Sequence, residues 1–318
     1  MTWFQRLLLV TIFLTFVLVV IGGAVRATDS GLGCPDWPTC HGKLIPKAEK
    51  HTLIEFSHRT AAAVVGVVFL GVTYFTFRTE RRNPLVFWLA FSAGLLLVAQ
   101  IVLGGITVKA ELPAEIVAAH LATAMAFLGV LIVTAVVSNM RRRGLRAFAL
   151  ASDTTFTRLA VFASAATLAT LILGSYISGT EASLACSGWP LCNGSLVPGG
   201  GSAEGLHFLH RLLAGVLGLL LAALVYVALD ERRRQPLLLA LCWAALAAYV
   251  AQALVGAANI WTELADGVVI AHLGLAALLW CLMVAISALS YYLPGEDARP
   301  EAADAPEADL AKVTQWAR

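Results

Sequence analysis

The segment CPDWPTCHGKLIP, residues 34–46, returns later in the chain as CSGWPLCNGSLVP, residues 186–198. Both cysteines, the tryptophan and the closing proline recur at an offset of 152 residues, the separation of residues 34 and 186. The same offset relates many flanking residues, among them Gly22 and Gly174, His58 and His210, Arg59 and Arg211, Gln100 and Gln252, Gly104 and Gly256, and His120 and His272. A fixed long period is the signature of internal repetition. The sequence therefore predicts two copies of one structural unit.

The composition places both copies in a membrane. Of the 318 residues, 59% are hydrophobic and only 13% are charged, about half the charged fraction of an ordinary soluble protein. Uncharged runs of about twenty apolar residues are long enough to cross a bilayer as helices. Eight such runs occur, near residues 4–25, 52–77, 84–108, 114–138, 156–178, 204–229, 236–260 and 267–291.

Four runs fall in each copy, which predicts an all-α membrane protein of eight transmembrane helices in two tandem four-helix bundles. Because four is an even number, both copies have the same direction through the membrane. We assign residues 1–138 to the first bundle, 139–155 to a linker and 156–291 to the second bundle. The remaining residues, 292–318, are rich in Ala, Asp and Glu and predict a disordered tail.

The distribution of basic residues predicts the orientation. One set of alternate loops is rich in arginine and carries Arg78, Arg81, Arg82, Arg141, Arg142, Arg143, Arg146, Arg232, Arg233 and Arg234. The opposite set carries fewer basic residues, namely Arg26, Lys43, Lys47, Lys50 and Lys109. By the positive-inside rule the arginine-rich loops and both termini are cytoplasmic, and the cysteine-bearing loops lie outside. The net charge of +2 gives no reason to expect a nucleic-acid partner.

The first apolar run has two interpretations. It follows Arg6 and precedes small residues, as in a cleaved signal peptide. Its counterpart at 156–178 lies in the middle of the chain, where no signal peptide is cleaved, and this favours a retained helix.

Duplicated histidines are the strongest chemical signal. His58, His120, His210 and His272 each lie about six residues into an apolar run from the outer side, which places them roughly 9 Å below the surface. Two imidazoles at one depth in one bundle suit a planar metal cofactor between them. Two ligands fit haem better than structural zinc, which prefers four, and no C-x-x-C-H motif for covalent haem is present. The alternative for each histidine is a hydrogen bond to a neighbouring helix.

The copies differ beside the first histidine of each pair. Glu55 precedes His58 by three residues and shares its helical face, whereas the equivalent of Glu55 is His207. An ionisable group at membrane depth is a functional candidate, and the asymmetry suggests one haem for chemistry and one for electrons. Glu55 could instead pair with Arg59 or Lys50. His207 could lie near the second haem or donate to an outer loop.

Two arginines follow the histidines, Arg59 after His58 and Arg211 after His210. A guanidinium group at this position can pair with haem propionates. Simple anchoring at the membrane interface is the alternative.

The four loop cysteines lie in a compartment where disulfides persist, if the predicted orientation holds. Cys34 is expected to pair with Cys40, and Cys186 with Cys192. Each bond could pin its loop as a lid over the histidines, or exchange electrons as an exposed redox pair. A zinc site formed by all four cysteines is a third alternative. Cys242 and Cys281 lie within spans and are expected to be core residues.

The joint pattern resembles the haem A synthase family. It consists of EFSHR at 55–59, HR at 210–211, AAH at 118–120, IAH at 270–272 and the two C-x5-C loops. The resemblance covers residues 4–291 and implies a bacterial inner-membrane enzyme that oxidises a ring methyl of haem O to the formyl group of haem A, for haem-copper terminal oxidases. His58 and His120 would then hold the substrate haem, His210 and His272 a resident haem b, and Glu55 would be catalytic.

The resemblance also implies partners. Haem O would come from the haem O synthase, electrons would pass to a carrier that the sequence does not identify, and the chain could form a homo-oligomer. Two other functions compete with this one: a diheme b-type cytochrome, and a non-catalytic haem carrier or thiol-redox membrane protein. All four histidines lie near one membrane face, which is a weak arrangement for passing electrons across the membrane.

Overall fold

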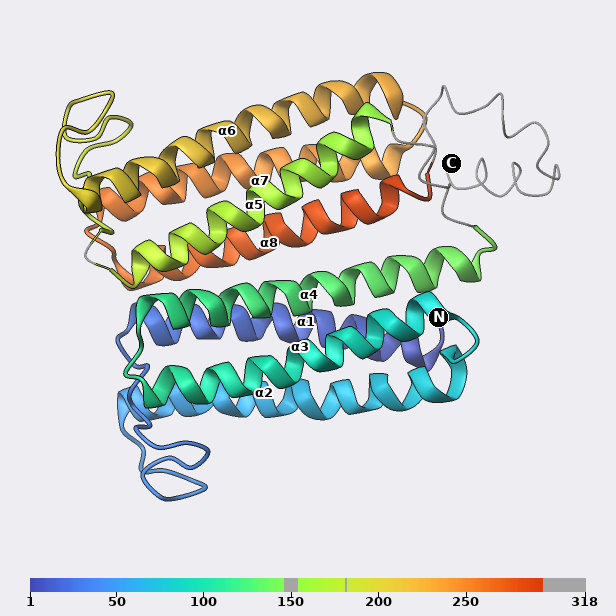
Figure 1. Ribbon diagram of the computed structural model, residues 1–318, viewed down its shortest axis with the longest axis horizontal. Coiled ribbons are helices and arrows are strands. Elements are labelled where there is room, and N and C mark those ends of the chain that lie inside the picture. The colour runs from blue at the N-terminus through green and yellow to red at the C-terminus, as the bar shows by residue number, and fades with distance from the viewer. Residues whose placement is uncertain (146–153, 181, 294–318) are drawn as a thin grey trace.

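A computed structural model describes residues 1–145, 154–180 and 182–293, and these residues form eight long helices (Figure 1). Their bounds are α1 Trp3–Ala27, α2 Lys50–Phe75, α3 Pro84–Lys109, α4 Ala114–Arg142, α5 Thr155–Ser178, α6 Ser202–Glu231, α7 Pro236–Trp261 and α8 Asp266–Ser290. A short π-helical turn, η1 Thr76–Glu80, extends α2. All eight are long and apolar enough to cross a membrane, so the predicted all-α membrane fold is confirmed.

Local sequence signals set where these helices begin. Thr2 forms a capping box with Gln5 at the start of α1, which satisfies backbone N–H groups that have no partner within the helix. Pro84 and Pro236 open α3 and α7, where the missing N–H of proline costs nothing. The predicted runs match the helices to within a few residues, with one correction: α4 continues to Arg142, so the linker starts later than residue 139. Residues 146–153 of that linker and nearly all of the predicted tail lie outside the described residues.

The helices form two four-helix bundles that pack side by side (Figure 1). In the first bundle neighbours follow the order α1, α2, α3, α4 around a ring, and α4 closes the ring against α1. The second bundle repeats this order with α5, α6, α7 and α8. Consequently α2 lies diagonally opposite α4, and α6 diagonally opposite α8.

Helices α1, α4, α5 and α8 form the contact between the bundles. The indole N–H of Trp280 in α8 donates to the carbonyl of Met125 in α4 at 2.9 Å, and its ring packs against Gly129. Because α1 contacts both α2 and α8, the first apolar run is an integral part of the packed structure.

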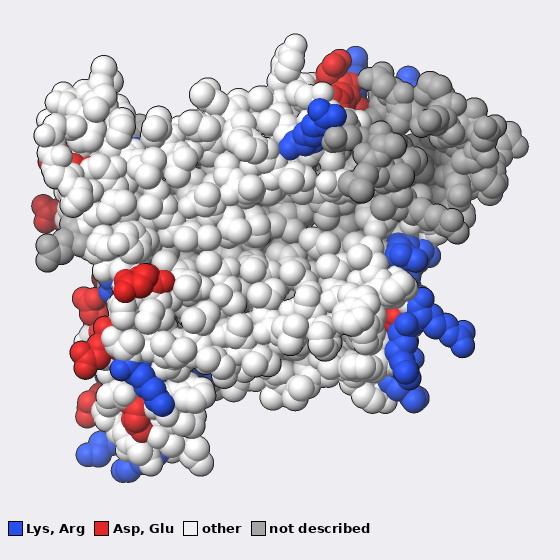
Figure 2. Space-filling view, in the orientation of Figure 1, with Lys and Arg blue, Asp and Glu red and all other residues white. Residues whose placement is uncertain are grey.

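Charged side chains gather at the two ends of the helices, and the face shown in Figure 2 carries almost none between them, where the helices are strongly hydrophobic. We call the end with the loops at 28–49 and 179–201 the cysteine end, and the opposite end the arginine end. The apolar band is what a lipid bilayer requires of a membrane protein surface. Which end faces the cytoplasm stays a prediction from the basic residues.

Candidate functional site

The four histidines come from diagonally opposed helices near the cysteine end. His58 lies in the first three turns of α2 and His120 in the first three turns of α4. His210 in α6 and His272 in α8 occupy the same places in the second bundle. Within each bundle the two imidazoles are close enough for their charges to interact. The structure therefore brings together one histidine pair per bundle, as the sequence predicts.

Each imidazole ring packs against a glycine of the neighbouring helix. A Cβ atom built on that glycine would approach His Cε1 to between 2.9 and 3.2 Å, tighter than nearly all real contacts. The pairs are Gly22 with His58, Gly104 with His120, Gly174 with His210, and Gly256 with His272. Glycine is required here because any larger residue would push the ring away.

The polar atoms of these rings are incompletely satisfied. Nδ1 of all four histidines is buried without a hydrogen-bond partner. The side-chain amides of Gln100 and Gln252 lie 3.0 and 3.4 Å from Nε2 of His120 and His272, and the Oε1 atoms of both glutamines are also buried without partners. Buried polar atoms normally find partners, so this repeated shortfall points to a bound group.

A haem fits this donor set. Haem brings four nitrogen ligands of its own and needs the protein only for the axial positions, which histidine fills. Across the described residues, no three His, Cys, Asp or Glu side chains converge as a metal site held by protein alone would require. The two imidazoles of each bundle would hold a haem iron.

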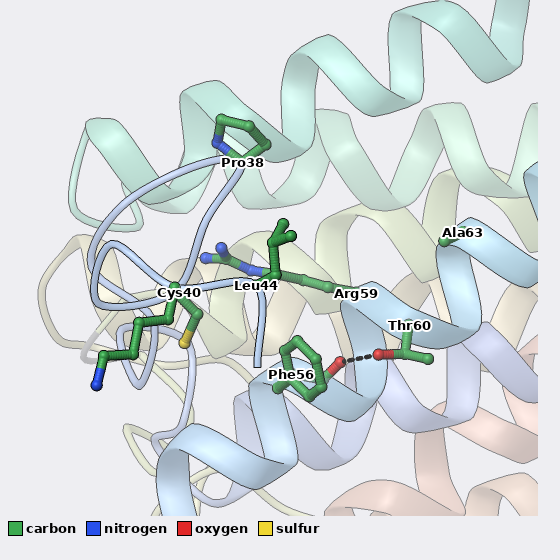
Figure 3. Close-up of a pocket in the computed structure, with 8 residues that line it drawn as sticks. Pro38, Cys40, Leu44, Phe56, Arg59, Thr60 and Ala63 are labelled. Carbon is green, nitrogen blue, oxygen red and sulfur yellow. Dashed lines mark hydrogen bonds between the residues drawn. The ribbon is translucent and has the colours of Figure 1, made fainter. Parts of the chain in front are cut away.

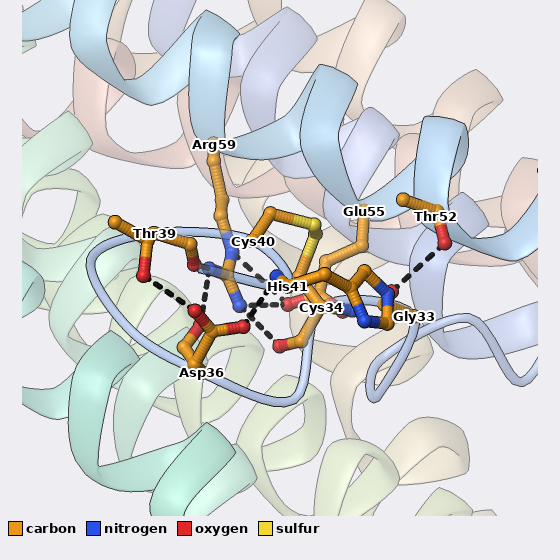
Figure 4. A network of polar contacts seen from close by, with 9 residues as sticks. All are labelled: Gly33, Cys34, Asp36, Thr39, Cys40, His41, Thr52, Glu55 and Arg59. Carbon is orange, nitrogen blue, oxygen red and sulfur yellow. Dashed lines mark hydrogen bonds and ion pairs between the residues drawn. A yellow bond between two sulfur atoms is a disulfide. The ribbon is translucent and has the colours of Figure 1, made fainter. Parts of the chain in front are cut away.

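Glu55 is buried, with 3% of its surface exposed, and is held by the loop and by Arg59 (Figure 4). Its Oε2 accepts a hydrogen bond from the backbone N–H of Cys34 at 2.7 Å. Its Oε1 accepts from Nε and Nη2 of Arg59 at 3.1 and 2.5 Å. The structure thus realises the ion pair with Arg59 and fixes the carboxylate one helical turn from His58.

Arg59 clamps the loop at residues 34–46 to α2. Besides Glu55, its guanidinium donates to three backbone carbonyls, those of Cys34, Asp36 and Thr39, at 2.7–2.8 Å. All five N–H donors are then used. A haem propionate could bind Arg59 only if some of these bonds opened.

Arg211 clamps the second loop in the same way. It donates to the carbonyls of Cys186, Gly188, Pro190 and Leu191, and no carboxylate of the described residues takes part in this clamp. In place of Glu55 the second bundle has His207, whose Nδ1 lies 3.1 Å from the Ala182 carbonyl and 3.4 Å from the Cys186 amide nitrogen. His207 is therefore a partner of the outer loop.

Disulfides close both loops, Cys34 with Cys40 and Cys186 with Cys192. The thiolates that a zinc site would need are consumed in these bonds. In the first loop the half-buried Asp36 adds a carboxylate that accepts from the Thr39 hydroxyl and from the His41 and Gly42 amides. These hydrogen bonds lower the pKa of Asp36 to about 2, and the bond from Thr39 contributes most.

The first loop reaches across the mouth of its bundle. The Trp37 ring packs on Gly105 of α3, 3.2 Å from a Cβ built there, and Gly105 follows the glycine that supports His120. A pocket of about 220 Å³ opens between the loop and α2, with Cys40 and Leu44 on one side and Phe56, Arg59 and Thr60 on the other (Figure 3). The loop therefore covers the cysteine end of the histidine site, which favours the lid interpretation of the disulfide.

Comparison with known proteins identifies the family. The family model described as COX15-CtaA, cytochrome oxidase assembly protein, matches residues 5–284 and, overlapping these, residues 201–308. The chain belongs to this family. The resemblance noted in the sequence is thereby confirmed.

Curated relatives of this COX15-CtaA chain carry the name heme A synthase. The protein of Alkalihalophilus pseudofirmus is 30% identical over 283 residues, covering 86% of this chain and 92% of its own. The Symbiobacterium thermophilum protein is 32% identical over 251 residues, covering 76% and 80%. The Shewanella oneidensis protein is 25% identical over 334 residues, covering 90% and 96%. The similarity thus spans both bundles.

Reasoning from the sequence of this family member missed the roles of four glycines and two glutamines. Gly22, Gly104 and Gln100, with their counterparts, were visible as duplicated positions, but their contacts with the histidines were not. The sequence signal for these contacts was that each glycine and each histidine recur together at the 152-residue offset.

Proposed function

We propose that the chain is a haem A synthase, which oxidises the ring methyl of haem O through the alcohol to the formyl group of haem A. One observation carries the proposal: the two sites share their histidines, glycine supports and glutamines, yet among the described residues only the first has a buried carboxylate, Glu55, one turn away. Two equivalent electron-transfer haems would need no such difference. Membership of a family whose relatives are named heme A synthase supports the same conclusion.

The two sites have different occupants in this proposal. His58 and His120 hold the substrate haem, and His210 and His272 hold a resident haem b. When bound, haem b supplies one-electron redox chemistry. The buried unpartnered Nδ1 atoms of both pairs support ligation in both bundles.

Glu55 is the proposed catalytic residue. Withdrawal of electrons from the substrate's macrocycle makes the ring methyl acidic and its carbon electrophilic. A carboxylate fixed beside it can then accept the proton or stabilise developing positive charge. The bonds from Arg59 and from the Cys34 N–H hold this carboxylate in place, so that little reorganisation is needed when charge develops.

The proposal also includes the location of the protein and its partners. The chain lies in the bacterial cytoplasmic membrane with the cysteine end outside, as its basic residues predict. It receives haem O from the haem O synthase and passes electrons to a separate carrier. The clamped, disulfide-closed loops exclude water from the site, which strengthens electrostatic interactions inside it.

Haem extraction tests the proposal. The chain is expressed in cells that make haem O but have no other haem A synthase, and the extracted haems are separated by chromatography. We expect haem A beside haem b. The double variant His58→Ala, His120→Ala should retain haem b and make no haem A. Haem b alone, at two per unsubstituted chain, would instead identify a diheme cytochrome.

A further inference from the structure

The interface between α2 and α3 in the first bundle differs from the equivalent interface between α6 and α7 in the second. We call each interface a seam, and the difference lies on the arginine-end side of the histidines. In the second bundle Tyr249 of α7 donates its hydroxyl proton to the Ala214 carbonyl of α6 at 2.8 Å. Its ring also covers Gly218, where an added Cβ would lie 2.4 Å from the tyrosine oxygen. Tyr249 thus fills the space between α6 and α7.

The first bundle leaves the equivalent space open. The 152-residue offset relates Tyr249 to Leu97 and Gly218 to Gly66. A Cβ built on Gly66 meets no atom within 4 Å, and Leu97 has no hydroxyl to bridge the helices. Toward the arginine end the seam closes, because Phe69 of α2 packs against Gly94 of α3.

This open seam lies on the arginine-end side of the histidine site. Gly66 follows His58 by eight residues, which is about 12 Å along the helix axis. Leu97 precedes Gln100 by one helical turn, and the Gln100 amide contacts His120. The opening at Gly66 and Leu97 therefore lies within two to three helical turns of the place where the proposed substrate haem would be ligated.

Iron ligands cannot distinguish the two haems, because both bundles offer the same histidines, glycines and glutamines. Haem O differs from haem b chiefly in a long isoprenoid chain that replaces a small vinyl group. A site that accepts haem O needs an apolar channel for this chain, whereas a site for haem b does not. Discrimination must come from the surroundings of the ligands.

We propose that the seam between α2 and α3, open at Gly66 and Leu97, holds the isoprenoid chain of haem O, and that Tyr249 closes the equivalent seam and restricts the second bundle to haem b. This inference rests on the proposed function, since it presumes haem O in the first bundle. Tyr249 and Leu97 are then specificity-determining residues that touch the substrate's tail or the space it needs.

The first test removes the Tyr249 side chain that fills the seam of the second bundle. Full-length chain carrying His58→Ala and His120→Ala, so that only the second bundle binds haem, is produced in cells that make haem b and haem O. We expect extraction to give haem b alone. Adding Tyr249→Leu should let haem O appear at a level comparable to haem b, whereas Tyr249→Phe, which keeps the ring, should leave haem b alone. Haem b alone in Tyr249→Leu, or haem O before any change at 249, would overturn the inference.

The reciprocal test places a tyrosine in the seam of the first bundle. Its result does not depend on that of the first test. Leu97→Tyr, in a chain with all histidines intact, should lower the content of haem O and haem A about tenfold, equivalent to about 1.4 kcal/mol. Leu95→Tyr, the same change at a side chain of α3 that is 58% exposed, should leave it unchanged. One haem b per chain should remain in both variants, which reports that they fold.

The experiments distinguish a failure of the seam inference from a failure of the proposed function. Unchanged haem O and haem A in Leu97→Tyr would overturn the seam and leave the enzyme intact. Haem b alone in the unsubstituted chain would overturn the proposed function, and the seam inference with it.

Discussion

Glu55 and His207 occupy equivalent places in the two bundles and contact the same backbone group, the amide of the first loop cysteine. The shared contact means that either residue can hold its loop. Only Glu55 adds a negative charge, and Arg59 balances it. The difference between the bundles at this position is therefore electrostatic rather than architectural.

Glu55→Gln tests that difference. Glutamine keeps the size and can still accept the bond from Cys34 N–H, but it removes the charge. We expect haem O or the alcohol to accumulate while haem A formation falls roughly a hundred- to a thousandfold, the effect of about 2.7–4 kcal/mol lost from a transition state. Haem content should be unchanged, because His58 and His120 are untouched. His207→Gln is the matched control and should be milder; haem A formation at the parental rate in Glu55→Gln would remove the carboxylate from catalysis.

The glycine supports give a second prediction about single residues. An alanine Cβ at position 174 would lie 2.9 Å from His210 Cε1, so Gly174→Ala must displace the ring, at a cost of about 1–3 kcal/mol. We expect a lower haem b content and a weaker low-spin spectrum. Gly215→Ala lies on α6, the helix that carries His210, and has nothing within 4 Å of its added Cβ, so it should keep both. Equal spectra in the two variants would contradict the proposed support of His210.

Each cysteine loop behaves as one element, closed by a disulfide and clamped by an arginine. The first loop has a further set of bonds centred on Asp36. Because its pKa is lowered from 3.8 to about 2, these bonds are fully present above pH 3.8. They are lost only as the pH falls toward 2.

Protection of the loop amides reports this dependence. We expect hydrogen exchange at Gly42, corrected for the intrinsic rate, to be constant at all pH values above 3.8. Asp36→Asn weakens the acceptors and should raise the exchange rate without changing that of the α2 amides. A protection factor that rises or falls near neutral pH would show that another group controls the loop.

The sequence predicts helices and loops unequally well. Spans were placed within a few residues, because a bilayer fixes the length of apolar helix that crosses it. The end of α4 was missed, since Asn139, Arg141 and Arg142 are polar and yet continue the helix. For Arg59 the sequence indicated Glu55 as one partner by its spacing of four residues. The three loop carbonyls were not predictable, because every residue has a backbone carbonyl and only the folded loop determines which of them Arg59 reaches.

Over the whole molecule, each bundle contains its own histidine pair, which we propose as haem ligands. His210→Ala with His272→Ala should therefore remove one haem and leave the first pair able to bind haem O. The converse holds for His58→Ala with His120→Ala. Reduced-minus-oxidised spectra and extracted haem per chain measure this independence. Loss of both haems from either double variant would mean that the bundles do not bind haem separately.

The side-by-side packing of the bundles puts both histidine pairs at the same end of the molecule (Figure 1). An electron that moves from one pair to the other travels parallel to the membrane plane. Only movement of charge through the membrane potential carries an energy of about 2.3 kcal/mol per elementary charge per 100 mV. Exchange between the two bundles thus does no electrical work, and its equilibrium is the same in an energised membrane as in detergent.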